Sequence, residues 1–216
     1  MLQRDRYFLR LIGRLFELLG AFCCALFLSA PIIAISLLLW ATQGRPIFFG
    51  SSRMGLHGQP FTMWKFRTMA IDPEDRGVSG ADKAARITQV GVWLRATRLD
   101  EFPQLWNILC GHIRFVGPRA PLPEYYDAFE DLYLRVLQVK PGITGLATLR
   151  YHAREEAVLA ACETPEATDA AYRRVCIPRK AELDLIYVRN RSVCFDLVLI
   201  WETLSKPLAG LTVVKR

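Results

Sequence analysis

Metal-binding and disulfide-forming patterns are scarce in this chain. It contains three histidines and six cysteines, and no two cysteines stand in C-x-x-C spacing. A structural zinc site needs several such ligands at close spacing, and a disulfide framework needs paired cysteines in an oxidising compartment. We therefore expect reduced, mostly buried thiols in a cytoplasmic protein, without a zinc site or a disulfide framework.

Nucleic-acid-binding signatures are also missing, since neither an RNA-binding aromatic motif nor a finger spacing occurs. The chain is nevertheless basic, with a formal net charge of +7. Such a surplus suits an anionic partner, which can be a membrane surface, the phosphates of a nucleotide or a polynucleotide. Because a long apolar segment accompanies the basic residues, we expect anionic membrane lipids and no nucleic acid as partners.

Charged residues are absent between Leu18 and Gly44. The most apolar part, residues 18–41, would be about 36 Å long as a straight helix, which is enough to cross a bilayer. A cleaved signal peptide fits less well, because the segment is long for one and ends without a small-residue cleavage site. We therefore predict a membrane element at residues 1–44.

Two features of this segment favour a re-entrant helix over a spanning one. Pro31 lies near its middle, where it removes a backbone donor and kinks the helix, and Ser29 can bond a freed carbonyl. Arginines on both flanks place both ends on the cytoplasmic side by the positive-inside rule. Proline kinks also occur in spanning helices, so both topologies stay open, and we predict the re-entrant one. The flanking arginines are Arg4, Arg6, Arg10 and Arg14 before the segment and Arg45 and Arg53 after it.

A basic strand is predicted after a connector rich in Gly, Pro and Ser at residues 43–60. Residues 61–69 are β-prone, and their period of two puts Lys65 and Arg67 on the same face. Two cations on one face of an apolar strand can clamp a phosphate group. The alternative is a pair of solvated charges on an edge strand.

An adjacent carboxylate pair, Asp100-Glu101, precedes a stretch at residues 101–111 with helical spacing of its apolar residues. Pro103 fits the first turn of that helix and Gly111 its end. The dipole and free amides at a helix N-terminus keep a carboxylate ionised and also attract phosphate. The pair is therefore a candidate for phosphate chemistry, and the alternative is that Asp100 only caps the helix.

Four stretches of the sequence, in this order behind the apolar segment, resemble the bacterial sugar transferase family. Its members are small monotopic polyprenyl-phosphate phosphoglycosyl transferases that begin the assembly of surface polysaccharides or glycoprotein glycans. The resemblance implies a monotopic enzyme on the cytoplasmic face of a bacterial inner membrane. The stretches are KFRTM (65–69), LDEFPQLWN (99–107), FVGPRAP (115–121) and KPGITG (140–145), and the likeness covers residues 10–150 and resumes at 181–192.

The resemblance also implies a reaction. Asp100 would attack a UDP-sugar, release UMP, hold the phosphosugar and pass it to polyprenyl (undecaprenyl) phosphate, a ping-pong route. Mg²⁺ is the implied cofactor, with Asp100 and Glu101 as its protein ligands. The implied phosphate contacts are Lys65, Arg95 and Arg119, and the strand alternation adds Arg67 as a candidate. The resemblance also implies two acidic positions that help bind metal or nucleotide, Glu124 and Asp184.

This chain departs from the family pattern in three places. The membrane turn reads Ser29-Ala30-Pro31 instead of Ser-Pro, and Pro-Arg-Pro is replaced by Pro118-Arg119-Ala120-Pro121. Residues 146–184 are helix-prone, which predicts a helical insert around 150–180. We expect a solvated helical pair there, and contact with substrate or a partner is the alternative.

The last segment, residues 192–208, carries an apolar stripe at helical spacing. Such a stripe either closes the core or lies in the membrane interface, and we expect core packing. The stripe consists of Val193, Leu197, Ile200, Trp201, Leu204 and Leu208.

We predict an α/β, mostly helical, membrane-associated domain with short β elements. Residues 1–44 would form the re-entrant membrane helix and residues 45–216 a catalytic domain on the cytoplasmic face. Two alternative functions stay open: a membrane-anchored protein that binds phosphate without turnover, and a phosphatase with an aspartyl phosphate. The sugar, the glycan pathway and the oligomeric state are not determined by the sequence, and a homo-oligomer is compatible with it.

Overall fold

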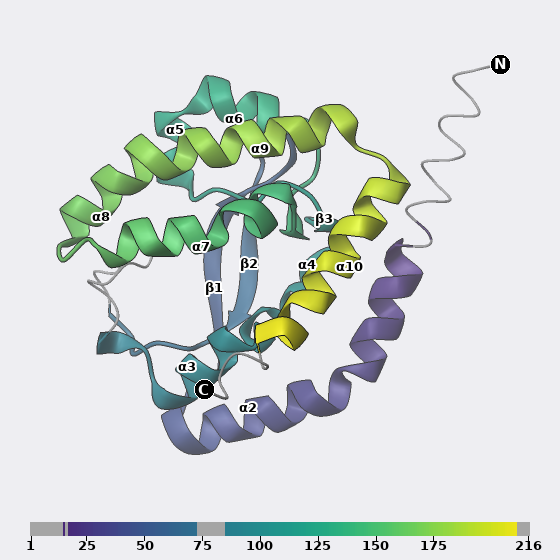
Figure 1. Cartoon of the computed structure of the whole chain (residues 1–216). Helices are drawn as coiled ribbons and strands as arrows, with labels where there is room; N and C mark the ends of the chain where they lie inside the picture. Colours follow the sequence, from purple (N-terminus) through teal and green to yellow (C-terminus); the bar gives the residue numbers. More distant parts are fainter. Residues whose placement is uncertain (1–14, 16, 73–84, 211–216) are drawn as a thin grey trace.

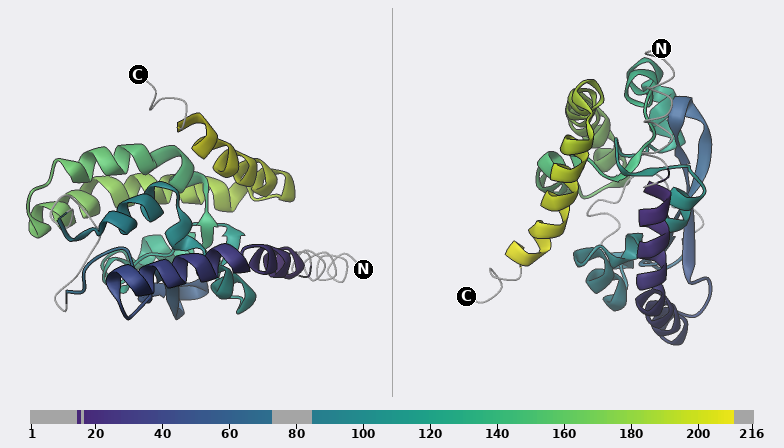
Figure 2. Two further views of the ribbon diagram at one scale, coloured as in Figure 1. Left: turned by 90° about the horizontal axis from the view of Figure 1, so that it is seen from below. Right: turned by 90° about the vertical axis from the view of Figure 1, so that its right-hand side faces the viewer.

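The structure is a computed structural model that describes residues 15, 17–72 and 85–210 (Figure 1). Within these residues the protein is mostly helical with short strands, as predicted. In both views of Figure 2, the N-terminal helices and the strand hairpin lie on one side and the long helices of the C-terminal half on the other. The arginines predicted to precede the membrane segment, residues 4, 6, 10 and 14, lie outside the described residues.

The N-terminal apolar segment forms two helices that meet at an angle of 53°, Glu17–Phe27 and α2 (Ser29–Gln43). No single helix in the described part of the chain is both long and apolar enough to cross a membrane. Taken together, the two helices of this bent pair reach that length and apolar character. The bend adjoins Ser29 and Pro31, and the Ser29 hydroxyl donates to the Leu26 carbonyl at 2.7 Å. The break therefore lies where the sequence predicted the membrane turn.

The bent pair is packed onto the rest of the protein along one side only. Ala21 of its first helix contacts a buried cluster with Leu105 and Ile108, and Leu39 of α2 is buried with Phe66. The opposite side of the pair exposes large apolar side chains, including Phe22, Leu26, Phe27, Ile33, Leu37 and Trp40.

An antiparallel hairpin follows, formed by β1 (Phe48–Met54) and β2 (Pro60–Phe66) and closed by η1 (Leu56–Gly58). The predicted alternation holds for residues 61–65 of β2, since Met63 is buried while Thr62 and Trp64 are exposed; it breaks at Phe66, which is buried against α2. Asn107 bonds the second edge of β2: its Oδ1 accepts from the Trp64 N–H at 3.0 Å, and its Nδ2 donates to the Thr62 carbonyl at 2.7 Å.

The helix predicted after the carboxylate pair is present, and a second helix precedes the pair. They are α3 (Gln89–Ala96), which Thr88 caps, and η3 (Leu99–Glu101) followed by α4 (Gln104–Leu109). Gly111 ends α4 with a φ of 82°, a backbone conformation that favours glycine. Asp100 and Glu101 thus lie in a short 3-10 turn just before α4.

Two short parallel strands, β3 (Arg114–Val116) and β4 (Gly142–Thr144), bring the FVGPRAP and KPGITG segments together. Gly117 is required there, because a Cβ at this position would lie 2.5 Å from the Lys140 carbonyl oxygen. The connection between the strands contains α5 (Pro123–Ala128) and α6 (Glu130–Val136).

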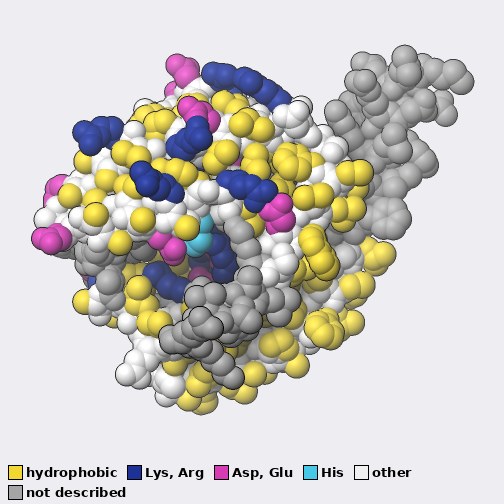
Figure 3. Space-filling view, in the orientation of Figure 1, with side chains coloured by type: hydrophobic (Ala, Val, Ile, Leu, Met, Phe, Trp, Pro, Cys, Tyr) yellow, Lys and Arg dark blue, Asp and Glu magenta, His cyan; other side chains and the backbone are white. Residues whose placement is uncertain are grey.

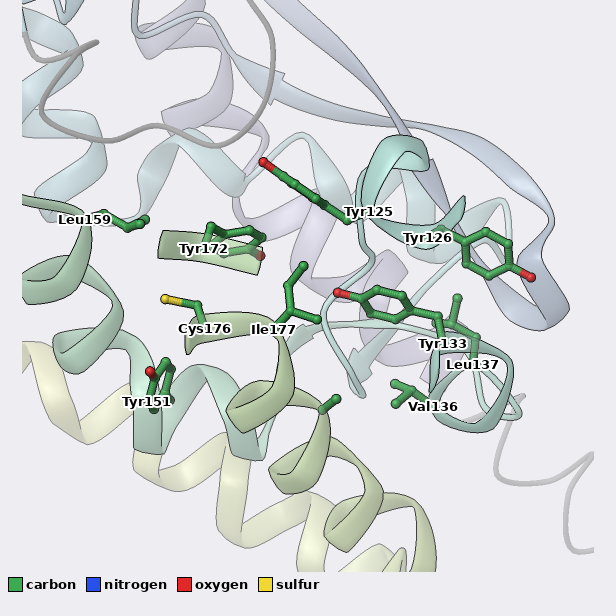
Figure 4. Close-up of a cluster of buried hydrophobic side chains, with 11 residues drawn as sticks. Tyr125, Tyr126, Tyr133, Val136, Leu137, Tyr151, Leu159, Tyr172, Cys176 and Ile177 are labelled. Atoms are coloured by element: carbon green, nitrogen blue, oxygen red, sulfur yellow. The ribbon is translucent and has the colours of Figure 1, made fainter. Parts of the chain in front are cut away.

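The segment predicted as a helical insert is helical, but it is not a solvated pair. It forms α7 (Leu146–Ala160), α8 (Pro165–Ala171), the π-helical turn η4 (Tyr172–Cys176) and α9 (Ile177–Asn190). Figure 4 shows Tyr151, Leu159 and Tyr172 in one buried cluster with Tyr125 of α5. The expectation of a solvated pair is wrong because these apolar side chains complete the main core.

The final helix, α10 (Val193–Gly210), also differs from the prediction. Leu199 is fully buried, whereas Trp201 is 73% exposed, and Val193, Leu197 and Leu204 are exposed as well. Of the stripe residues whose side chains the structure describes, Ile200 alone packs partly against the core, and Leu208 lies outside them. The prediction of core packing is therefore wrong for most of the stripe, because a neighbouring face of the helix is the one that meets the core.

Asp184 of α9 is a buried carboxylate that accepts a hydrogen bond from the backbone in the first turn of α7. Asp184 is 5% exposed, and the backbone N–H of Ala147 donates to it, so α9 supplies the cap that Gly145 lacks a side chain to provide. Burial raises the pKa of Asp184 to about 7, although Lys180 and the Ala147 N–H oppose the rise. The ionised form of Asp184 is therefore less favourable in the folded protein than in the unfolded chain.

Replacing Asp184 by Asn should stabilise the protein at neutral and higher pH. Because the folded-state pKa of about 7 exceeds the unfolded value of about 4, the wild type loses stability as the pH rises from about 4 to 7. Asn keeps the acceptor for Ala147 without the charge. We expect the Tm of Asp184→Asn to exceed that of the wild type at pH 8 and the gap to shrink at pH 5. A gap that widens at pH 5 would contradict this assignment.

Candidate active site

Both residues of the carboxylate pair are buried. Asp100 and Glu101 are 8% and 7% exposed. Figure 3 shows a hollow on the face seen in Figure 1, with Lys or Arg and Asp or Glu side chains inside it. Arg98, in the left-handed region with a φ of 56°, turns the chain immediately before the pair. This turn directs both carboxylates inward.

Glu101 is fully engaged by cations. Its Oε1 accepts from Lys65 Nζ at 2.8 Å and from Arg119 Nη2 at 2.9 Å, and its Oε2 lies 3.8 Å from Arg98 Nη1. Burial alone would raise the pKa of Glu101, but Lys65 and Arg119 outweigh it and hold the pKa well below its usual range. Glu101 therefore stays ionised and fixes these cations in place.

Asp100 has a different environment. It makes no hydrogen bond or ion pair with any residue that the structure describes, although Lys65, Arg95 and Arg119 are close enough for their charges to lower its pKa. Burial outweighs the three cations and raises the pKa of Asp100 above its ordinary value. No side chain caps α4, so Asp100 is not the helix cap that the sequence left as an alternative. Its carboxylate is thus free to react beside a cationic surface.

The cations reach the pair from separate elements. Lys65 comes from the end of β2 and Arg119 from the turn after β3, and Arg95 on α3 is held by Thr68 Oγ1 at 3.0 Å from its Nε. A guanidinium fork and a lysine ammonium at the same place suit phosphate oxygens. The structure therefore brings together Lys65, Arg95, Arg119 and the carboxylate pair.

Arg67 is not brought to this group. Strand β2 ends at Phe66, and Arg67 Nη2 donates to the last carbonyls of the α2 segment, Gln43 at 2.6 Å and Gly44 at 3.0 Å. The predicted phosphate clamp of Lys65 with Arg67 does not form, because free carbonyls at a helix C-terminus attract the second cation.

The two remaining predicted residues lie apart from the pair in their contacts. Glu124 is an exposed residue in the first turn of α5, and no contact joins it to Asp100 or Glu101 among the residues described. Asp184 bonds the first turn of α7, as shown above. A part in binding stays a prediction for both.

Sequence reasoning missed Arg53 as a site residue. In the hairpin register Arg53 pairs with Phe61, and so shares a face with Lys65. Its Nη1 donates to the Ala120 carbonyl at 3.2 Å, and burial and the neighbouring Arg119 lower its pKa to about 10. Arg53 thus positions the turn that carries Arg119. The pairing register of β1 and β2 was the signal that could have found it.

Helix α7 also borders the site. Burial lowers the pKa of His152, and the charges of Arg98 and Arg119 lower it further. Glu155 raises the pKa of Arg119, and its Oε1 accepts from Lys180 Nζ at 2.8 Å. The 146–184 segment is therefore part of the electrostatic surroundings of the pair.

A metal ion would find few protein ligands here. In the described part of the chain, no group of three or more His, Cys, Asp or Glu side chains is placed to hold one. Mg²⁺ usually takes one or two carboxylates and completes its shell with water and substrate phosphates. Asp100 fits that role, because its oxygens are unbonded. Glu101 fits it only if Lys65 and Arg119 release its oxygens.

Comparison with known proteins agrees with the pattern of motifs. Residues 8–210 match the family model described as bacterial sugar transferase. An uncharacterized sugar transferase of Bacillus subtilis, EpsL, is 34% identical over 203 residues, which cover 93% of this chain and 89% of that protein.

Two further relatives carry names that state a reaction. The UDP-glucose:undecaprenyl-phosphate glucose-1-phosphate transferase of Escherichia coli is 32% identical over 201 residues, 91% of this chain and 40% of its own length. The UDP-N-acetylgalactosamine-undecaprenyl-phosphate N-acetylgalactosaminephosphotransferase of Aeromonas hydrophila is 29% identical over 203 residues, 92% of this chain and 44% of its own length. This chain therefore spans less than half of these two proteins, whose names specify different sugars.

Replacing Lys65 by Gln should raise the pKa of Asp100 further. Lys65 is the largest of the charges that lower it, so its removal leaves burial and the Glu101 charge less opposed. A ¹³C NMR titration of the aspartate carboxyls in detergent measures the change. Arg135→Gln, which removes an exposed cation of α6, should leave the titration unchanged. An Asp100 pKa that falls or stays constant in Lys65→Gln would contradict this electrostatic model.

Proposed function

Because this chain belongs to the bacterial sugar transferase family, we propose that it moves a phosphosugar from a UDP-sugar to polyprenyl (undecaprenyl) phosphate through a covalent aspartyl intermediate. In this proposal the product is a polyprenyl diphosphate-sugar, which starts the assembly of a surface glycan. The sugar is left open, since relatives with similar identity are named for glucose and for N-acetylgalactosamine.

One observation carries the proposal. Of the two adjacent buried carboxylates, Glu101 is bonded by cations while Asp100 is not bonded by any described residue. A carboxylate nucleophile must be ionised and unshielded, and an anionic diphosphate will approach it only if nearby cations offset the repulsion. The site supplies unbonded oxygens and nearby cations: Lys65, Arg95 and Arg119 act on Asp100 without taking its oxygens, and their charges favour its ionised form against burial.

In the first step, an Asp100 carboxyl oxygen attacks the phosphorus that bears the sugar. The new bond is the P–O bond of an acyl phosphate, and the bond that breaks joins this phosphorus to the bridging oxygen. UMP leaves with that oxygen and its electron pair. Arg119 and Lys65, which Glu101 holds near Asp100, would bind the phosphate oxygens on which charge accumulates.

In the second step, a phosphate oxygen of the polyprenyl phosphate attacks the same phosphorus. The acyl phosphate bond breaks, and Asp100 returns to its ionised form. Because both steps use one phosphorus and one aspartate, Glu101 needs only to keep the cations in position throughout.

Mg²⁺ is the proposed cofactor, with Asp100 and the phosphates of the donor as its ligands. When bound, it would neutralise charge on the transferring phosphoryl group and the leaving phosphate. Glu101 would contribute to metal binding only in a state in which the donor phosphates have drawn Lys65 and Arg119 away.

The proposed location is the cytoplasmic face of a bacterial inner membrane, with the bent helix pair re-entrant. The 53° bend and the exposed apolar side of the pair support it. The exposed residues of α10, Trp201 among them, would lie in the interface, where an aromatic residue with a polar edge is favoured. Anionic lipids would meet the basic surface of the protein.

The proposal is tested with a panel of UDP-sugars, Mg²⁺ and polyprenyl phosphate, which regenerates Asp100 so that UMP release can be followed over many turnovers. We expect the wild type to release UMP with at least one donor and Asp100→Asn to release it at least about 10³-fold more slowly, because the amide keeps the size but loses the nucleophile. Asp131→Asn, which changes an exposed carboxylate of α6, serves as the matched control and should match the wild type.

Three outcomes separate the candidate functions. Near-normal UMP release by Asp100→Asn would refute the role given to that residue. Donor binding without UMP release across a broad panel would favour a phosphate-binding protein. Hydrolysis of the donor to a free sugar phosphate, without any need for polyprenyl phosphate, would favour a phosphatase.

A further inference from the structure

Hydrogen bonds of the 3-10 type continue beyond η3 into the first residues of α4. The N–H groups of Glu101, Phe102, Leu105 and Trp106 donate to the carbonyls three residues earlier, at 3.1–3.2 Å. Three residues per turn align side chains at positions i and i+3. Glu101, Gln104 and Asn107, all of them polar, follow one another at this spacing in one row, which Arg98 precedes.

Every member of this row except one has a partner. Arg98 pairs with Glu101 at 3.8 Å, Glu101 accepts from Lys65 and Arg119, and Asn107 bonds the edge of β2. Gln104 lies between Glu101 and Asn107 and is 0% exposed. Neither its Nε2 nor its Oε1 has a hydrogen-bond partner among the residues that the structure describes.

A buried amide in this state destabilises the folded protein. Each unsatisfied buried polar group costs about 1–3 kcal/mol, whereas an apolar side chain of the same shape would cost nothing of that kind. Gln104 therefore adds nothing to the fold through its amide. A group of this kind beside a reacting residue requires a functional explanation.

The direction of helical side chains identifies the partner. Cα–Cβ bonds point toward the N-terminus of a helix, so Gln104 leans toward the turn that holds Asp100 and Glu101. The oxygens of Glu101 are already taken by cations, while those of Asp100 are not. Gln104 and Asp100 are four residues apart, and the linking residues Phe102 and Pro103 have αR backbone. Side chains at i and i+4 are neighbours on such a backbone, and Gln and Asp bond at this spacing on helices.

We propose that Gln104 is a positioning residue for Asp100, an inference that rests on the proposed function. Its Nε2–H would donate to the carboxyl oxygen of Asp100 that does not attack, which leaves the other oxygen aimed at the phosphorus. In the acyl phosphate the bonded oxygen becomes the carbonyl, and the same N–H holds it. No bond to Gln104 forms or breaks, so no further reactant is required.

Gln104→Met tests this inference, because Met has a similar length and volume and lacks the amide. The Tm of the variant should equal or exceed that of the wild type. Its kcat for UMP release should fall about tenfold to a hundredfold, as misplacement of a reacting group predicts, with the KM for the donor within about twofold. A residue with a merely structural role would lower the Tm and leave kcat unchanged in the folded fraction.

Asn107→Met is the matched control in the same row. It leaves the Trp64 N–H and the Thr62 carbonyl without their partner, so its Tm should fall. Gln104→Leu, a second apolar replacement, keeps the test informative if the Met variant packs poorly.

The results separate this inference from the proposed function. Wild-type UMP release with a lower kcat and an undiminished Tm for Gln104→Met or Gln104→Leu supports the positioning role. If the wild type releases UMP and both variants keep its kcat, the positioning role is overturned and the transferase reaction stands. The same conclusion follows if the Tm of both variants falls, as that of Asn107→Met is expected to fall. A wild type that releases no UMP overturns both.

Discussion

The ion pairs of Glu101 with Lys65 and Arg119 are the interaction on which the site depends. They join the 3-10 turn before α4 to the end of β2 and to the turn after β3, three segments far apart in the sequence. A buried carboxylate is tolerated only with such partners, because an unpaired buried charge is strongly destabilising. With Glu101 fixed in this way, Lys65 and Arg119 are already in position before a substrate binds.

The neighbouring carboxylate uses the same cations without bonding them. Asp100 lies within the field of Lys65, Arg95 and Arg119 but keeps its oxygens unbonded by described residues. Adjacent positions in one turn thus give one carboxylate that organises the site and one that is available for chemistry. This division explains why two acidic residues stand next to each other among buried cations, and the proposed contact of Gln104 depends on it.

Local patterns in the sequence predicted the elements around the site well. The alternation in residues 61–65, the helix after Pro103, the stop at Gly111 and the break next to Ser29 are properties of neighbouring residues, and all four are observed. Pairing between distant segments was the harder part. Arg67 is drawn to the end of α2, and Arg53 shares a face with Lys65 only through the hairpin register. The apolar face of α10 was assigned to the core although Leu199, outside the predicted stripe, is the residue that packs there.

The most direct test of the account is the location of the covalent intermediate. Protein incubated with a competent UDP-sugar, Mg²⁺ and no polyprenyl phosphate is digested, and the peptides are analysed by mass spectrometry. The account predicts a mass increase equal to one phosphosugar on the peptide that contains Asp100, and loss of that increase when polyprenyl phosphate is added. UMP release with the added mass on another residue, or with no added mass, would contradict it.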